Sequence, residues 1–366
     1  MRTGIFAGDP MEPKHGGRAA GFNTPNRFQR LHLEPIEIDL QYEDDPPPLP
    51  TTFFLDSSRS ILARNDSPDI PFTYSINPYR GCEHGCIYCY ARPSHEYLGF
   101  SAGLDFERKI MVKLNAPRLL EEILRKKSWQ PQEVAFSGNT DCYQPVERKL
   151  QITRKCLEVF LRYRNPVGVV TKNALVLRDI DILKEMAGLN LVHIMISVTS
   201  LDPALIRKME PRTSAPAVRL QTIEELARNA IPVGVNAAPI IPGLTDEELP
   251  AILSAAAERG ATTAGYILAR FPGPVESLFL EWVNREFPGR ASKIISRIRD
   301  TRQGRLSDAR FGTRMTGEGH IAQAINDLFD LHAQKYNLTK RWCGLSTDRF
   351  VSHRDSQIDL FRDPLH

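Results

Sequence analysis

The pattern of apolar and polar residues predicts strands that alternate with helices from about residue 72 onward. Short apolar runs suited to buried strands are separated by stretches with helical spacing. The predicted strands cover residues 72–76, 133–136, 167–171, 191–198, 233–241 and 264–268. The predicted helices cover residues 116–127, 148–162, 180–186 and 218–230, a segment that begins near residue 245, and residues 276–287, 291–302 and 319–336. This alternation is typical of right-handed βαβ units and a parallel sheet, either open or barrel-like.

The first 70 residues have no such periodicity. They are rich in Pro, Gly, Asn and Asp and contain a proline-rich tract at 46–50. That composition indicates an irregular arm, disordered through about residue 25. We therefore expect an N-terminal arm (1–70), an α/β domain (71–272), a helical basic extension (273–340) and a C-terminal tail (341–366).

Composition narrows the class of protein. The chain has 366 residues, a hydrophobic fraction of 42% and a net charge of +3, which are values of a soluble globular protein. No segment approaches the 18 or more apolar residues that a membrane span needs. The first residues are too poor in apolar side chains for a signal peptide. We expect a cytoplasmic protein with no membrane partner.

Positive charge is concentrated between residues 285 and 315. This basic segment contains Arg290, Lys293, Arg297, Arg299, Arg302, Arg305, Arg310 and Arg314 with few acids between them. Such a segment is suited to follow a nucleic-acid backbone or to neutralise an anionic ligand. The alternative is a solvated helical face, because Ile294, Ile295 and Ile298 form an apolar stripe opposite the charges.

Three cysteines follow the first predicted strand. Cys82, Cys86 and Cys89 have the spacing C-x3-C-x2-C, and the aromatic Tyr88 stands just before the third. Cysteine thiolates are the usual ligands of iron-sulfur clusters, and a [4Fe-4S] cube normally takes four. Three thiolates on one loop would leave the fourth iron open to another ligand. The spacing therefore favours a cluster site built to bind a further molecule.

A structural zinc site is the alternative reading of the same loop. Zinc needs four ligands, usually supplied as two pairs. The remaining cysteines, Cys142, Cys156 and Cys343, stand singly, although His84 or His95 would complete a tetrahedron. On this reading the protein would be a nucleic-acid-binding module whose metal only holds the loop in place.

Polar residues follow the second, third and fourth predicted strands. In α/β barrels, active sites gather at the carboxyl ends of the strands. The candidate site residues are Ser137, Asn139, Thr140, Asp141, Lys172, Ser197 and Thr199. Asp141 and Lys172 together provide both signs of charge, as a zwitterionic ligand requires. The alternative is that Ser137 and Asp141 merely cap the next element.

The cysteine loop and its place after the first strand are similar to the signature of the radical S-adenosylmethionine (SAM) superfamily. Between residues 57 and 335 the chain further resembles the spore photoproduct lyase-like branch of that superfamily. The similar stretches are residues 77–82, 89–92, 140–147, 170–172 and 210–212. The resemblance implies a partial (β/α)6 TIM-like barrel for residues 71–272, with the cluster loop after its first strand.

The resemblance also implies a reaction. A [4Fe-4S] cluster on the three cysteines would bind SAM and cleave it reductively to a 5′-deoxyadenosyl radical. That radical would abstract hydrogen from an unidentified substrate, expected to be anionic, such as a nucleic acid. A flavodoxin or ferredoxin-type protein would supply the electron. Tyr88 would pack near the adenine, residues 137–141 would contact the methionine amine, and Lys172 its carboxylate. Ser197 and Thr199 would contact the ribose or the carboxylate.

One position departs from the lyase pattern. Spore photoproduct lyase places its hydrogen-donating cysteine three residues before an aspartate that follows the second strand. If Asp141 is that aspartate, Gly138 stands at the donor position. Cys142 is then a candidate donor, or a buried thiol that behaves as an apolar residue. Photoproduct repair is therefore an alternative within the enzyme reading and is not the main expectation.

Overall fold

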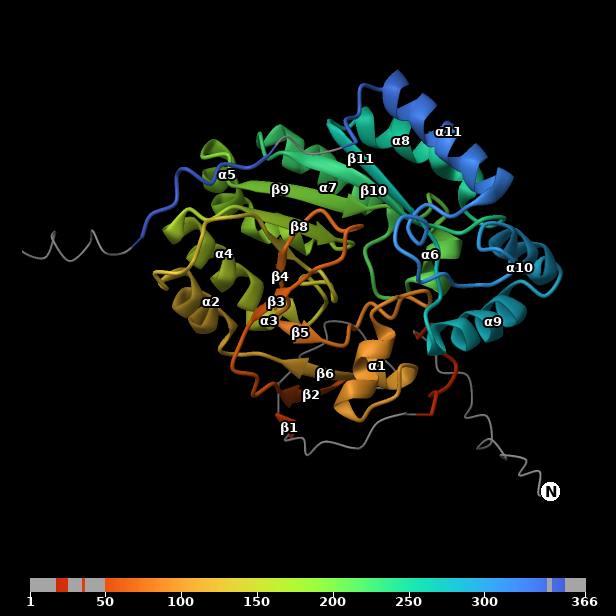
Figure 1. Cartoon of the computed structure of the whole chain (residues 1–366), viewed down its shortest axis with the longest axis horizontal. Coiled ribbons are helices and arrows are strands. Elements are labelled where there is room, and N and C mark those ends of the chain that lie inside the picture. The colour runs from red at the N-terminus through yellow and green to blue at the C-terminus, as the bar shows by residue number, and fades with distance from the viewer. Residues whose placement is uncertain (1–17, 26–34, 37–49, 341–343, 353–366) are drawn as a thin grey trace, which may run out of the picture.

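The structure is a computed structural model that describes residues 18–25, 35–36, 50–340 and 344–352. The expectations for residues 1–17 and for Cys343 lie outside this part. Within it, two sheets and the helices packed on them form the framework (Figure 1). No described helix has both the length and the apolar character needed to cross a membrane.

The main sheet carries the predicted alternation. Its strands are β3 (Leu62–Arg64), β4 (Tyr74–Ile76), β7 (Val134–Phe136), β8 (Val167–Thr171), β9 (Val192–Ser197), β10 (Val233–Ile240) and β11 (Thr263–Leu268). The spatial order is β11-β10-β9-β8-β7-β4-β3. All neighbours from β4 to β11 pair in parallel, whereas β3 pairs antiparallel with β4. The sheet stays open between its edges β3 and β11, so the expected partial barrel is confirmed.

Helices pack on this sheet (Figure 1). They are α2 (Ala116–Leu124), α4 (Ile152–Tyr163), α5 (Ile180–Gly188), α7 (Pro216–Arg228), α8 (Leu249–Ala257) and α11 (Gly319–Lys335). The other helical segments are η1 (Arg92–Leu98), α1 (Leu104–Arg108), α3 (Glu147–Leu150), η2 (Ala174–Asp179), α6 (Pro203–Met209), η3 (Asp246–Glu248), α9 (Pro274–Glu286) and α10 (Ala291–Asp300). The single helix expected over 148–162 is two helices, because Gln151 between them has a left-handed φ of 52°.

A second, smaller sheet lies beside the barrel. Its strands are β1 (Pro35–Ile36), β2 (Thr52–Leu55), β5 (Tyr79–Arg80) and β6 (Lys109–Val112), in the order β1-β2-β6-β5. Residues 1–70 were expected to be irregular, and for β2 and β3 that expectation was wrong. These strands have only a few residues each, which is too short for a period-2 pattern to stand out.

The segment 18–25 was expected to be disordered, and this too was wrong. Arg18, Ala19 and Ala20 are buried. The Arg18 guanidinium donates to the carbonyl of Glu107 at 2.9 Å, and the Ala20 N–H donates to its carboxylate at 3.1 Å. Arg285 of α9 donates to the Ala19 carbonyl at 3.1 Å. Local composition cannot reveal contacts made with residues so far along the chain.

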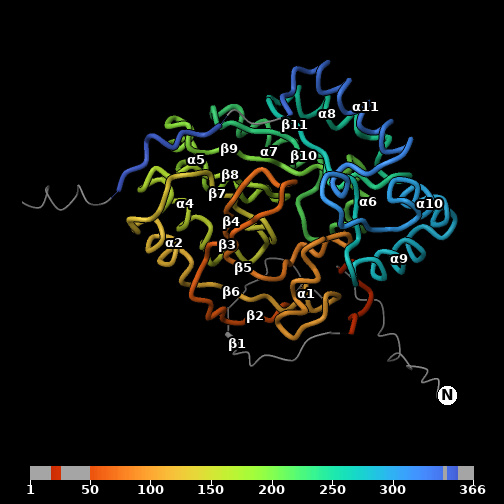
Figure 2. The backbone as a smooth tube through the Cα atoms, in the orientation of Figure 1, coloured from red at the N-terminus to blue at the C-terminus, as the bar shows by residue number. Residues whose placement is uncertain are grey.

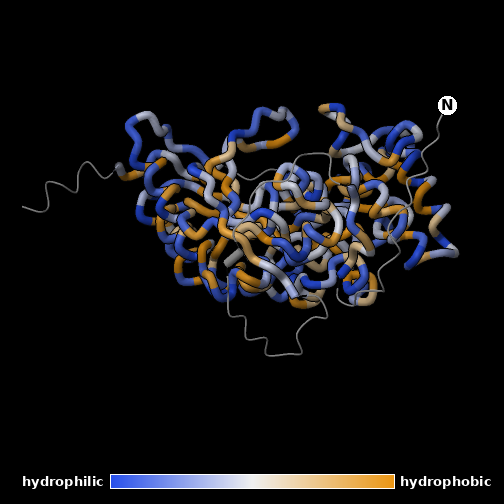
Figure 3. The backbone as a smooth tube through the Cα atoms, turned by 90° about the horizontal axis from the view of Figure 1, so that it is seen from below, coloured by the Kyte–Doolittle hydropathy of each residue, from blue (hydrophilic) through white to orange (hydrophobic). Residues whose placement is uncertain are grey.

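Two large hydrophobic cores and a small cluster of Cys82, Ala91 and Phe106 hold the described part of the chain together. The larger lies between the main sheet and the helices α2, α4, α5, α7, α8 and α11. The second packs the segment 18–25 and the cysteine loop against α6, α9 and α10, around Phe279 and Trp282. Figure 2 traces this path from the red N-terminal segment to the blue helices, and Figure 3 shows hydrophobic positions interspersed with hydrophilic ones along the elements. The second core joins α9 and α10 to the cysteine loop.

The packing of segment 18–25 can be tested at Gly103. A Cβ at this position would lie 2.1 Å from the Phe22 carbonyl oxygen and 2.9 Å from the Asn23 Cα. We expect Gly103→Ala to displace the segment and to lower the free energy of unfolding by roughly 1–3 kcal/mol, the usual cost of overpacking. Urea denaturation and faster tryptic cleavage after Arg18 would report it. Gly289→Ala is the control, because its Cβ would meet nothing within 4 Å. Equal behaviour of the two variants would contradict the packing described.

Candidate active site on the cysteine loop

The three cysteines lie on a compact loop after β4 and β5. Cys82 and Cys86 are buried and Cys89 is partly buried. The loop turns on itself, since the Gly85 N–H donates to the Cys82 carbonyl and the Cys89 N–H to the Cys86 carbonyl, at 3.3 and 3.2 Å. Gly85 has a φ of 66°, and a Cβ there would lie 2.9 Å from the Glu107 carboxylate. Only glycine fits this turn.

The environment of the thiols fits a cluster of positively charged iron ions. Burial raises the pKa of Cys86 well above its usual range and that of Cys89 to about 11, although Arg92 and Lys172 oppose the shift at Cys89. Without metal these thiols would stay protonated at neutral pH. A bound metal ion deprotonates a coordinating thiol outright, so the site suits thiolate ligands only when metal is present.

The arrangement of possible ligand side chains bears on the zinc alternative. Nowhere in the described part of the chain do three His, Cys, Asp or Glu side chains converge so that they could hold a single metal ion. A four-iron cube has no such requirement, because each thiolate binds its own iron. Of the two proposed fourth ligands, His84 is engaged through both ring nitrogens, and His95 is buried. Asp141 and Asn173 contact the two ring nitrogens of His84, and His95 is buried against the rings of Phe100 and Phe106.

A buried ion pair clamps the loop. The Arg92 guanidinium and the Glu107 carboxylate, both fully buried, are 2.5 Å apart. Arg92 also donates to four carbonyls, those of Gly85, Cys86, Ala102 and Gly103, at 2.8 to 3.2 Å. Because one planar group satisfies so many acceptors, the backbone of the cysteine loop is fixed relative to α1.

A second contact fixes the loop from the strand side. His84 Nδ1 lies 3.4 Å from the Asp141 carboxylate. Burial lowers the pKa of His84, but Asp141 and Cys82 raise it, to about 10. Burial likewise raises the pKa of Asp141, while His84 and backbone donors lower it to about 2. Asp141 also accepts hydrogen bonds from the Thr171 hydroxyl and the Lys172 N–H, both at 2.8 Å. The carboxylate therefore ties the second and third parallel strands to the loop.

The neighbouring polar candidates mostly make local contacts. The Ser137 hydroxyl accepts from the Cys142 N–H at 2.8 Å. The Asn77 side chain accepts from the N–H groups of Asn139 and Thr140, at 2.9 and 3.2 Å. The Thr140 hydroxyl donates to the Tyr79 carbonyl at 2.8 Å. These bonds shape the turn after β7, in line with the capping alternative.

Three of the other candidates converge on Glu210, a residue to which sequence reasoning assigned no role. Its carboxylate accepts hydrogen bonds from the hydroxyls of Tyr88 and Thr199 and pairs with the buried Arg219. Burial raises the pKa of Glu210, but Arg219 and Lys172 lower it, to about 2. The Lys172 ammonium lies 5.9 Å from the Tyr88 ring centre and 3.5 Å from the Ala238 carbonyl. Ser197 takes part only through its carbonyl, which accepts from Arg219 at 3.0 Å.

Neither candidate position, Gly138 or Cys142, provides an accessible thiol that could donate hydrogen. A Cβ added at Gly138 would lie 2.8 Å from the Ser75 Cβ, so a cysteine there would displace Ser75. Cys142 is fully buried in the larger core, and burial raises its pKa well above the usual range. The Gly138 carbonyl instead accepts from the hydroxyl of Tyr90 at 2.7 Å. Tyr90 is 48% exposed and follows the last cysteine directly.

Several arginines of the basic segment form ion pairs or hydrogen bonds within the protein. Arg297 pairs with Asp246, Arg310 with Asp308 and Glu318, and Arg314 with Asp69. Arg302 is 2% exposed and donates to the carbonyls of Leu268, Ala269, Thr313 and Arg314. Arg297, Arg302 and Arg314 therefore tie this segment to other parts of the chain.

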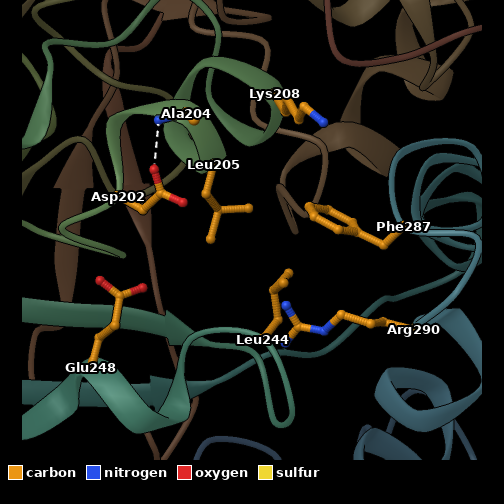
Figure 4. Close-up of a pocket in the computed structure, with 8 residues that line it drawn as sticks. All are labelled: Asp202, Ala204, Leu205, Lys208, Leu244, Glu248, Phe287 and Arg290. Carbon is orange, nitrogen blue, oxygen red and sulfur yellow. Dashed lines mark hydrogen bonds between the residues drawn. The ribbon is translucent and has the colours of Figure 1, made fainter.

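A cavity of about 270 Å³ lies between α6, the start of α8 and the junction of α9 with α10 (Figure 4). Its charged lining residues already have protein partners. Asp202 accepts from the Ala204 N–H at 2.7 Å, and Glu248 accepts from the Ser200 hydroxyl at 2.7 Å. Lys208 pairs with Glu286 at 3.3 Å, and Arg290 donates to the Gly243 carbonyl at 3.0 Å. We assign no ligand to this cavity.

Comparison with known proteins agrees with this geometry. The family model of the radical SAM superfamily matches residues 76–256. An uncharacterised protein of Mycobacterium tuberculosis is 35% identical over 63% of this chain and 67% of its own length. One of Methanocaldococcus jannaschii is 29% identical over 48% of this chain and 63% of its own length.

Among solved structures, spore photoproduct lyase complexed with dinucleoside spore photoproduct has a similar fold. The TM-score is 0.55 at 14% identity, and the match covers 79% of this chain and 82% of the lyase chain. A double mutant of the lyase with bound AdoMet and dinucleoside spore photoproduct matches with a TM-score of 0.54, also at 14% identity. At this identity the likeness concerns the fold alone.

Sequence reasoning missed the groups that hold the loop. Arg92, Glu107 and Glu210 were assigned no role, although residues 89–92 and 210–212 lie in stretches that resemble the lyase-like branch. A charged residue within such a stretch was the available signal. The sequence around such a residue does not show what the residue binds, because partners such as Tyr88 and Glu210 lie far apart in the chain.

The clamp can be tested by removing its cation. Arg92→Met would leave the buried Glu107 carboxylate without a cation and would remove a donor from four carbonyls. We expect the free energy of unfolding of the metal-free protein to fall by about 3–5 kcal/mol, as for other broken buried pairs. The control is Arg118→Met, since Arg118 forms an exposed pair with Glu122, and it should cost no more than about 0.5 kcal/mol. Urea denaturation compares the two, and similar losses would show that the clamp does not stabilise the fold.

Proposed function

Because this chain belongs to the radical SAM superfamily, we propose that it holds a [4Fe-4S] cluster and SAM at the cysteine loop and acts by hydrogen abstraction on a separate substrate. The bound cluster and SAM supply one-electron reductive cleavage of the sulfonium, which yields methionine and a 5′-deoxyadenosyl radical. The protein contributes position and exclusion of solvent. The observation that carries the proposal is the set of three thiols on a loop that is buried and clamped within a radical SAM barrel.

We assign the SAM contacts as follows. Lys172 is the partner of the methionine carboxylate, because its ammonium lies inside the barrel beside Tyr88. We assign Tyr88 and Thr199 to the adenosine, and this is supported by the bonds of both hydroxyls to Glu210 beside Lys172. We retain Asp141 as a partner of the amine, which would share the carboxylate with its donors from His84, Tyr143, Thr171 and Lys172. Ser137, Asn139, Thr140 and Ser197 shape the surrounding turns.

A surface other than α10 supports an anionic substrate. Nucleic acid is the class of substrate that we favour. Two aromatic side chains are exposed near the end of β11, each with an arginine over its ring. Arg270 lies 5.4 Å from the Tyr90 ring centre, and Arg314 lies 4.7 Å from that of Phe311. Aromatic rings combined with arginines form stacking platforms for single-stranded bases. Photoproduct repair is less supported, because Ser75 closes the position at Gly138.

The electron is proposed to come from a flavodoxin or ferredoxin-type protein, and the location is proposed to be the cytoplasm, where thiols stay reduced. A nucleic-acid-binding module with a structural metal is the rival. In that case loss of a cysteine would destabilise the fold without any SAM cleavage to lose.

The test is anaerobic reconstitution followed by mass spectrometry of 5′-deoxyadenosine under dithionite. We expect the wild type to produce it and Cys89→Ala to produce none. Lys172→Met should raise the KM for SAM roughly 10- to 150-fold, the effect of losing a charge-assisted bond of about 1.5–3 kcal/mol. Lys127→Met is the control, because Lys127 is exposed and precedes β7 at the opposite end of the strands. A complete cluster that never cleaves SAM would exclude the proposed function.

A further inference from the structure

A polar contact joins two segments that are attached to the edges of the main sheet. One is the turn 65–73 between the edge strand β3 and β4, and the other is the segment 308–317 after α10. The second segment is tied to the edge strand β11, because the Leu268 N–H donates to the Met315 carbonyl at 2.8 Å. Neither segment contributes a residue to the hydrophobic clusters of the described chain. Charge and hydrogen bonds therefore hold the contact.

The contact is centred on the carboxylate of Asp69. Its Oδ2 lies 2.7 Å from Arg314 Nε, and its Oδ1 accepts from the Gly312 N–H at 2.8 Å. The Ser67 hydroxyl accepts from the same guanidinium. A guanidinium and a backbone N–H are also the groups that hold phosphate oxygens in complexes with nucleic acids. We call the Gly312 N–H and the Arg314 guanidinium the anion cradle.

The cradle lies beside a cation that forms no ion pair with a carboxylate of the described residues. The Arg270 guanidinium lies over the ring of Tyr90, 5.4 Å from its centre. Burial and the neighbouring Arg314 lower the pKa of Arg270, whereas Tyr90 and Asp69 raise it. The single carboxylate of Asp69 therefore acts on two guanidiniums. A second anion that approached Arg270 would be repelled by Asp69, so the two would compete for this place.

The cradle also lies next to the surface assigned to the substrate. The Tyr90 hydroxyl donates to the Gly138 carbonyl at 2.7 Å, and a Cβ at Gly138 would lie 3.7 Å from the ring of Phe72 in the turn that carries the carboxylate. Phe311 is 60% exposed, and its ring centre lies 4.7 Å from the Arg314 guanidinium. A single strand whose bases stack on Tyr90 and Phe311 would therefore carry its phosphates past the cradle.

We propose that the anion cradle binds a backbone phosphate of a single-stranded nucleic-acid substrate, and that Asp69 is an internal competitor which the phosphate displaces. The inference rests on the proposed function. A phosphate that replaces Asp69 keeps Arg314 and the Gly312 N–H paired, whereas a neutral ligand would leave the charge of Arg314 without a counter-ion. Only hydrogen bonds and an ion pair are exchanged. The contact thus holds the two segments together until an anionic strand arrives.

The experiment measures binding of a fluorescein-labelled single-stranded oligothymidylate to the reconstituted full chain, by fluorescence anisotropy at matched salt concentrations. We expect Asp69→Asn to bind roughly three- to tenfold more tightly than wild type, because a larger share of the molecules has a free cradle. Arg314→Gln should bind roughly tenfold or more weakly, because a charge-assisted bond to phosphate is lost. Its slope of log affinity against log salt should fall by about one.

Asp66→Asn is the matched control, because it makes the same charge change on an exposed side chain of the same turn. It should leave the affinity close to that of wild type. An ion pair with only a structural role would make Asp69→Asn and Arg314→Gln weaken binding alike. That result, equal tightening in Asp66→Asn, or the absence of binding in wild type and Asp69→Asn would overturn the inference.

The binding assay needs neither reductant nor SAM. Failure of the wild type to form 5′-deoxyadenosine under dithionite would refute the proposed function, whereas the affinities of the variants decide the role of the cradle. The two failures are therefore distinguishable.

Discussion

The buried pair between Arg92 and Glu107 is the interaction on which the site depends. Burying two charges is expensive and is tolerated only when each is paired and hydrogen-bonded. Here the guanidinium binds carbonyls on both sides of the cysteine loop, while Glu107 accepts from the segment 18–25. The small sheet, α1 and the N-terminal segment are therefore arranged around one ionic contact. A loop that must present three thiols in fixed positions gains rigidity from it.

Opposite charge is placed on either side of the loop. Glu210 and Asp141 stand toward the strand ends, each held ionised by a buried cation, Arg219 or His84. Arg212 stands behind it. Arg212 is paired there with Glu83, so the residues between Cys82 and Cys86 take part in the contacts that fix the loop.

Much of the barrel could be predicted from the sequence, because its strands are continuous apolar runs and its helices have clear spacing. The cysteine spacing likewise indicated the cofactor. The strands β2 and β3 were missed because most of their residues are not buried, whereas the equally short β4 and β7 are largely buried. Glu210 and Glu107 were missed because their partners are distant in the chain. The role of Asp141 was foreseen only in part, since its bond to His84 depends on how the loop folds back.

The contact between Ala19 and Arg285 has a consequence for biogenesis. The N-terminal segment closes over Glu107, yet it is itself held by a helix that is synthesised some 260 residues later. During translation, the bonds of this segment to Glu107 need only the first 107 residues, whereas its bond to Arg285 waits until α9 has been made. The N-terminal cover of the site is therefore complete only after most of the chain has been synthesised.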